Sequence, residues 1–354
     1  MKKWLSTFFL LAGCLITLVF FWPIDSHAQD RRLNLYIWSE YIDPEIIQAF
    51  ETKTNSRVIV SLYESNEDMV AKLQGGGVSQ YDVVVPTDYI VPAMVELKLL
   101  QPLNKDLLPN LKNLSPQFAK PLFDPENTYT AAYQWGTTAL GYRKDKLPQG
   151  FTPSWGLIFD PVQQVGPFVL IDDQRPMISS AALYLGLDPN TTAPNDLRQV
   201  QDLLLQTKKR SAGFIGGVGG KNQLLAGTAN VAIVYNGDAL RATEEDENIG
   251  FIIPQEGANL WMDSLAIPAE APNVELAHEF INYILDPEVG AKLSNYNRYA
   301  TPNAASLPLI APEDLDDPAI YPNEETQAKL YFNKPLEGEA ARLMDTVWTN
   351  VKSG

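Results

Sequence analysis

The first third of the chain alternates short apolar runs with amphipathic stretches. Residues 33–38 and 57–63 are rich in aliphatic, β-branched and aromatic side chains, which is typical of strands. Asp43 and the proline after it predict a helix start, because Asp caps a helix N-terminus and Pro fits the first turn. Asn66 is expected to cap a second helix, and residues 81–86 form a third apolar run. This order of elements predicts a parallel sheet covered by helices.

The same alternation returns later without a repeat of fixed period. Further strands are predicted at 168–172, 231–235, 249–254 and 265–268, and helices at 177–186, 195–209 and 273–285. A chain of 354 residues is too long for one small core and fits two α/β lobes.

The residues that follow the predicted strands are repeatedly aromatic, acidic or hydroxylic. Open parallel sheets bind ligands beyond the carboxyl ends of their strands, so these positions are the candidate site. They are Trp38-Ser39-Glu40-Tyr41, Thr87-Asp88-Tyr89, Asp172-Asp173, Tyr235-Asn236-Gly237-Asp238 and Trp261-Met262-Asp263.

These residue types suit a flexible organic cation such as a polyamine. A buried ammonium needs a carboxylate or hydroxyl acceptor, and aromatic faces attract cations while covering methylene groups. The candidate acceptors are Glu40, Asp173, Asp238 and Asp263, with Ser39 and Thr87 as further hydrogen-bonding groups. The candidate walls are Trp38, Tyr41, Tyr89, Tyr235 and Trp261. Any one of them could instead be a packed aromatic residue or a helix cap, as Asp88 could be, and only their joint occurrence favours a site.

Charge supports a cationic ligand and argues against nucleic acid as a partner. The formal net charge is −16 and the pI is near 4.6, so the surface repels phosphate backbones and anionic lipid.

The N-terminus predicts export across a membrane. Two lysines precede an apolar run, and small residues near Ala28 suit cleavage of a signal peptide spanning residues 1–28. Two alternatives remain: a lipoprotein acylated at Cys14, and a retained anchor helix. Cys14 is the only cysteine, so cleavage after Ala28 or a retained anchor leaves the folded part without disulfides or thiol chemistry.

Catalytic alternatives have little support in the sequence. The two histidines are His27, in the export segment, and His278, which is expected to be a solvated helix residue. No G-x-S-x-G elbow is present. The glycine-rich run at 216–221 does not fit a phosphate-binding loop and is interpreted as a flexible turn. A glycoside hydrolase using paired carboxylates remains the leading enzyme hypothesis, and no cofactor or metal site is predicted.

Several segments resemble the spermidine/putrescine-binding proteins of bacterial polyamine ABC transporters. The resemblance runs from Leu35 to about Lys352 and is strongest at Trp261-Met262-Asp263-Ser264-Leu265-Ala266-Ile267-Pro268, with further matches at Tyr36–Tyr41, Tyr63–Glu67, Tyr81–Pro86 and Tyr299–Asn303.

The resemblance implies an α/β, two-lobed periplasmic solute-binding fold of type II, with a ligand cleft between lobes joined by hinge strands. The expected lobes are 31–136 plus 263–311, and 137–262 plus 312–354. It also implies a periplasmic location, a membrane ABC permease as partner, and a monomer. In the family, residues matching Trp38, Glu40, Tyr41, Thr87, Tyr89, Asp173, Tyr235, Trp261, Asp263 and Tyr299 line the cleft. The position of Asp263 pairs with a ligand amine, that of Asp238 contacts ligand in putrescine-binding members, and Asn333 aligns loosely with a polar contact.

Two departures leave the choice of polyamine open. Pro176 stands where family members often carry Glu, and Tyr235 stands where Trp is usual. The carboxylate missing at Pro176 favours putrescine, because a diamine needs fewer acceptors. The acidic site and the family favour spermidine, and spermidine is the preferred prediction. Another organic cation, a metal, or a polyamine sensor without a transporter remain as alternatives.

Overall fold

The computed structural model describes residues 31–354, and its first strands form the parallel arrangement that the sequence predicts. Strand β1 (Arg32–Trp38) pairs in parallel with β2 (Arg57–Tyr63) and with the short β3 (Val83–Val84). Helix α1 (Pro44–Thr54) begins as predicted, because the Asp43 carboxylate accepts a hydrogen bond from the amide of Glu45.

The centre of the sheet is antiparallel, which the parallel arrangement predicted from the first strands did not anticipate. The long strand β4 (Thr130–Arg143) pairs with β9 (Ala258–Ala266), and β9 is also antiparallel to β3. No strand was predicted at β4 because its first twelve residues are buried on both faces, so polar and apolar positions do not alternate. The predicted strand at 265–268 is only the end of β9, so Trp261-Met262-Asp263 lies within a strand and not after one.

Beyond β4, the sheet continues into a second set of strands. Strand β7 (Val231–Tyr235) is antiparallel to β4 and parallel to β5 (Phe168–Ile171), which pairs with β6 (Phe214–Ile215). Strand β8 (Ile249–Ile252) pairs with β4, and β10 (Leu330–Phe332) pairs with β9. The order is therefore β2-β1-β3-β9-β4-β7-β5-β6.

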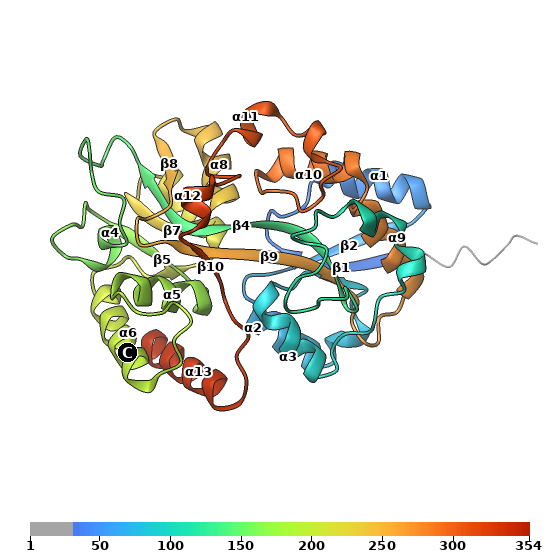
Figure 1. Ribbon diagram of the computed structural model, residues 1–354, viewed down its shortest axis with the longest axis horizontal. Helices are drawn as coiled ribbons and strands as arrows, with labels where there is room; N and C mark the ends of the chain where they lie inside the picture. Colours follow the sequence, from blue (N-terminus) through green and yellow to red (C-terminus); the bar gives the residue numbers. More distant parts are fainter. Residues whose placement is uncertain (1–30) are drawn as a thin grey trace, which may run out of the picture. The chain divides into compact units, whose positions relative to one another are not determined.

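Helices flank both halves of this sheet. In Figure 1, α1, α9 and α10 lie near β1 and β2, whereas α4, α5, α6 and α8 lie near β5, β7 and β8, and the β4–β9 pair runs between the two groups. The remaining bounds are α2 (Asn66–Gln74), α3 (Val91–Glu96), α4 (Gly156–Phe159), α5 (Gln174–Tyr184), α6 (Pro194–Lys208), α7 (Gly217–Leu225), α8 (Asn236–Glu245), α9 (Val274–Ile284), α10 (Pro287–Asn297), α11 (Pro312–Leu315), α12 (Glu324–Gln327) and α13 (Gly338–Ser353).

Two large hydrophobic clusters lie on the two sides of the β4–β9 pair. One contains Leu35, Phe50 and Phe280, and its other members come mostly from before residue 136 and from 261–320. The other contains Trp155 and Ile233, and it extends to the C-terminal helix α13. Each half of the sheet therefore has its own core.

Three local predictions were wrong. His278 is buried: its Nε2 accepts a hydrogen bond from the amide of Asn104, and its Nδ1 lies 2.7 Å from the carbonyl of Val274. The glycine-rich run is not a turn but begins helix α7. Ser65, and not Asn66, caps α2.

The predicted signal peptide at 1–28, including Cys14 and His27, lies outside the described residues. Within residues 31–354, no helix has both the length and the apolar character needed to cross a membrane.

Replacing Phe280 by Ala tests the first core. Phe280 is fully buried, and its ring meets that of Phe50 edge-on at 5.1 Å. The substitution should lower the free energy of unfolding by about 3–5 kcal/mol, measured by urea denaturation. Leu122→Ala is the control, since Leu122 is 98% exposed. An equal loss in both variants would contradict this packing.

Candidate ligand-binding site

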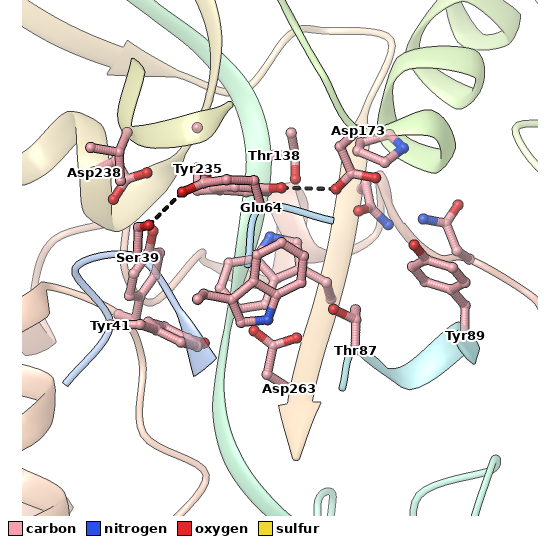
Figure 2. A pocket seen from close by; sticks show the side chains of 18 residues that line it. Ser39, Tyr41, Glu64, Thr87, Tyr89, Thr138, Asp173, Tyr235, Asp238 and Asp263 are labelled. Atoms are coloured by element: carbon pink, nitrogen blue, oxygen red, sulfur yellow. Dashed lines mark hydrogen bonds between the residues drawn. The ribbon is translucent and has the colours of Figure 1, made fainter. Parts of the chain in front are cut away.

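A single cavity collects side chains from both halves of the sheet. It lies beside the end of β1, the middle of β4 and β9, and the starts of α5, α7 and α8 (Figure 2). Eleven of the twelve residues predicted for the site line it, and Glu40 does not. The full lining is Trp38, Ser39, Tyr41, Glu64, Thr87, Tyr89, Thr138, Asp173, Pro176, Gly217, Val218, Tyr235, Asp238, Asn259, Trp261, Asp263, Tyr299 and Asn333.

Strand β9 places two of these residues by its alternation. Trp261 and Asp263 point to the cavity, whereas the intervening Met262 does not line it. The amide of Met262 donates instead to the carboxylate of Asp88, so Asp88 fixes β9 from outside the site rather than capping a helix through its side chain. Gly136 on β4 leaves room for Trp261, because a Cβ there would lie 2.7 Å from the indole.

Aromatic rings form much of the cavity wall. The ring of Trp261 meets Tyr299 at 5.3 Å and Tyr235 at 5.8 Å, both close to edge-on, and Tyr41 meets Tyr299 at 5.3 Å. The indole N–H of Trp38 donates to the carbonyl of Val85 at 3.1 Å, which fixes that ring at the end of β1. Such walls suit methylene groups and can attract a cation.

Asp263 is a carboxylate held away from water without a charged partner. It is 5% exposed, and its Oδ1 has no hydrogen-bond partner within the part of the chain that the structure describes. Burial raises the pKa of Asp263 to about 7, although the nearby hydroxyls of Thr87 and Tyr41 act in the opposite direction. An incoming cation would find here an acceptor that the protein itself leaves unpaired.

Asp173, at another wall of the cavity, is also a buried carboxylate that forms no ion pair within residues 31–354. It occupies the N-cap position of α5, but its side chain caps no backbone amide. Its Oδ2 accepts the hydroxyl of Tyr235 at 2.8 Å, while its Oδ1 is buried without a partner among residues 31–354. Burial raises the pKa of Asp173 to about 7, with a further contribution from the charge of Glu67.

The other two predicted acceptors already have cationic partners. Glu40 has a left-handed backbone with φ 51° and turns away from the cavity to pair with Lys221 and Arg241. Burial acts to raise the pKa of Glu40, but these two cations lower it overall. Asp238 lines the cavity, yet its Oδ1 lies 2.6 Å from Arg241. Glu40 therefore does not line the cavity in this structure, where it pairs with Lys221 and Arg241.

Sequence reasoning missed several residues that shape the site. Glu64 lines the cavity and accepts the Ser39 hydroxyl, and its position directly after β2 is the strand-end signal used for the other residues. The side-chain amide of Asn66 donates to the hydroxyls of Thr87 and Tyr89, both at 3.0 Å, and so positions them. No local sequence signal distinguishes Asn66 from a helix cap.

The arrangement suits capture of a cation rather than metal binding. Within residues 31–354, no three His, Cys, Asp or Glu side chains come together as metal ligands. The two carboxylates that lack cationic partners within residues 31–354, set among aromatic rings in a cavity, match an organic cation with separated charges. A two-lobed α/β protein with such a cavity belongs to the class of solute-binding proteins.

Comparison with known proteins gives the family. Residues 45–322 match the family described as bacterial extracellular solute-binding protein, and the chain belongs to it. The spermidine/putrescine-binding periplasmic protein of Escherichia coli strain K12 is 35% identical over 355 residues, covering 100% of both chains. The putrescine-binding periplasmic protein PotF of the same strain is 34% identical, covering 100% of this chain and 98% of its own.

A solved structure supports the two-lobed fold. It is described as a putative spermidine/putrescine ABC transporter from Listeria monocytogenes, and it superposes with a TM-score of 0.85 at 34% identity, covering 91% of this chain and 99% of its own. The two curated relatives are named as periplasmic binding proteins, and the solved structure is named as an ABC transporter.

Replacing Asp263 by Asn should stabilise the unliganded protein while weakening cation binding. The folded-state pKa is raised, so ionisation of Asp263 destabilises the folded state progressively above about pH 4 and fully above about pH 7. Asn removes that penalty, and the free energy of unfolding at pH 8 should rise by roughly 1–4 kcal/mol, with little change at pH 4.5.

Urea unfolding at both pH values measures this gain. Asp316→Asn, at an exposed position, is the control. It should change the free energy of unfolding by no more than about 0.5 kcal/mol at either pH. Destabilisation of Asp263→Asn at pH 8 would show that the carboxylate is satisfied in the unliganded protein.

Proposed function

We propose that this protein captures a polyamine in its cavity and delivers it to the membrane permease of an ABC transporter. The observation that carries the proposal is the pair Asp173 and Asp263, two buried carboxylates that each retain an unpartnered oxygen among aromatic rings. The names of full-length relatives, which specify spermidine and putrescine, support the same class of ligand.

A polyamine supplies the positive charges that the two buried carboxylates lack and a methylene chain that fits the aromatic walls. Each ammonium would form charge-assisted hydrogen bonds with a carboxylate, which contribute roughly 1.5–3 kcal/mol each. The methylene chain would lie against Trp261 and the neighbouring rings, so its apolar surface is buried. The quaternary nitrogen of choline has no N–H to donate, and its single hydroxyl could serve only one of the two carboxylates, which favours primary amines.

Delivery requires that the cavity open, and the β4–β9 pair is the proposed hinge. The proposed lobes are residues 31–136 plus 263–311, and 137–262 plus 312–354. Ligand held between them stabilises a closed form, which a permease can distinguish from the open form. We also propose that the protein binds its ligand as a monomer. It would be exported by the signal peptide at 1–28 or anchored to the membrane through Cys14.

Binding without catalysis is part of this proposal. Both ring nitrogens of His278 are occupied, Nε2 by the amide of Asn104 and Nδ1 by the carbonyl of Val274, and His278 does not line the cavity, so it is not placed to act as a general base there. The lining contains carboxylates, hydroxyls and rings, and Asp173 and Asp263 serve there as acceptors for ammonium groups.

Calorimetric titration with putrescine, spermidine, spermine and choline tests the proposed ligand class. We expect one-to-one binding of a polyamine at micromolar or lower Kd and no heat with choline. Asp263→Ala should weaken binding at least about 30-fold, because an ammonium would lose its buried partner.

Asp106→Ala is the matched control, since it removes an equal charge at an exposed position and should leave the Kd within about twofold. Absence of binding with every polyamine, or full affinity in Asp263→Ala, would overturn the proposal.

Polyamine affinity should depend on pH around neutrality. Asp173 and Asp263 have pKa values of about 7, so each is partly protonated at pH 7 and must lose its proton to pair with an ammonium. Affinity should therefore rise between pH 6 and pH 8, with release of about one proton per ligand at pH 7. Titrations in buffers of different ionisation enthalpy count the protons, and a flat affinity with no proton release would contradict these pKa values.

A further inference from the structure

The four carboxylates predicted as ammonium acceptors form two pairs, which differ in whether the protein's own cations already engage them. Asp173 and Asp263 form no ion pair with Lys or Arg anywhere in residues 31–354, and each keeps one buried oxygen without a partner. Glu40 and Asp238 are both engaged by cations of the protein itself. The number of acceptors open to a ligand is therefore smaller than the number of acidic residues suggests.

Arg241 joins both members of the engaged pair. Its Nη2 lies 2.6 Å from Oδ1 of Asp238 and 3.0 Å from Oε2 of Glu40. Its Nη1 donates to the carbonyls of Glu40 and Asn297, both at 3.3 Å, so the guanidinium is held by four acceptors. A guanidinium fixed in this way is not easily displaced by a ligand ammonium.

Lys221 adds a second fixed cation. Its side chain is 7% exposed, and its Nζ lies 2.6 Å from Oε2 of Glu40, the oxygen that Arg241 also contacts. Helix α7 brings Lys221 to this position, because the glycine-rich run is helical rather than a loop. Two cations thus share one carboxylate oxygen beside the cavity, so Glu40 has no unpaired charge left for a ligand ammonium.

Asp238, the member of the engaged pair that lines the cavity, lies at one side of it. In Figure 2, Asp238 and Asp173 lie at opposite sides, with Asp263 between them. A ligand with three ammonium groups that follows the lining carboxylates would place two groups at Asp173 and Asp263 and the third towards Asp238. That third group would approach Arg241.

The remaining wall residues do not replace the occupied acceptor. Pro176, in the first turn of α5, lines the cavity and offers no carboxylate. Glu64 also lines the cavity, but its Oε1 accepts the Ser39 hydroxyl and the residue is exposed, so an ammonium there would form only a hydrated pair of small net value.

We propose that Lys221 and Arg241 are specificity-determining residues that make this site selective for a diamine over a triamine. The inference rests on the proposed function and narrows its ligand class. A diamine uses Asp173 and Asp263, and its methylene chain lies between the aromatic walls. A triamine must leave its third ammonium beside two fixed cations, which lowers its affinity relative to the diamine.

The ratio of two dissociation constants tests this assignment. We expect the wild-type protein to bind 1,3-diaminopropane, putrescine or cadaverine at least tenfold more tightly than spermidine, by calorimetric titration. In the double variant Lys221→Gln/Arg241→Gln, Glu40 and Asp238 become free to accept an ammonium. The ratio of Kd for spermidine to Kd for the best diamine should then fall at least tenfold.

Two control variants and one further test variant separate a change of specificity from loss of structure. Arg241→Lys keeps the cation and should keep the wild-type ratio. Lys292→Gln/Arg143→Gln removes two positive charges from ion pairs outside the cavity lining and should also keep it. Lys221→Gln alone removes one of the two cations on Glu40, while Arg241 keeps its contacts, and it should shift the ratio in the same direction as the double variant but by less, so that poor folding of the double variant leaves a readable result.

The outcomes are distinguishable from failure of the proposed function. If no polyamine binds, the proposed function fails. If polyamines bind but spermidine is preferred by the wild-type protein, or the double variant weakens all ligands equally, the proposed function stands and the diamine assignment is overturned.

Discussion

The structure depends on two carboxylates that are kept out of water and that form no ion pair within residues 31–354. Asp173 and Asp263 are almost fully buried, and their raised pKa values show that burial disfavours their charge. In a protein selected only for stability such groups would be paired or replaced. Here the aromatic rings, the room left by Gly136 and the hydrogen bonds of Asn66 all maintain this arrangement. A ligand that brings matching positive charges offsets the destabilisation, and this links stability to binding.

The β4–β9 pair gives the cavity its floor and joins the two halves of the sheet. Because successive side chains of β9 alternate, Trp261 and Asp263 face the cavity while Asp88 holds the strand through the amide of Met262. The same strands carry the site and connect the two hydrophobic cores. Under the proposed function, bending of these strands opens the cavity to a ligand and closes it again.

Local signals were sufficient for some elements and insufficient for others. The Asp43 cap and the parallel β1–β2–β3 unit were predictable because they depend on neighbouring residues and on alternation. Strand β4 was not, because burial on both faces removes the alternation. Predicted residues that follow or lie within strands, such as Trp38 and Asp263, line one cavity. The pairing of Glu40 was not predictable, because Lys221 and Arg241 lie 181 and 201 residues away in sequence.

A crystal structure of the protein with bound putrescine tests the central claim most directly. The account predicts one ammonium within hydrogen-bonding distance of Asp263, the other within hydrogen-bonding distance of Asp173, and the methylene chain against Trp261. Lys221 and Arg241 should keep their contacts with Glu40 and Asp238. A ligand whose ammonium displaces Arg241 from Asp238, or one that binds away from both Asp173 and Asp263, would contradict the account.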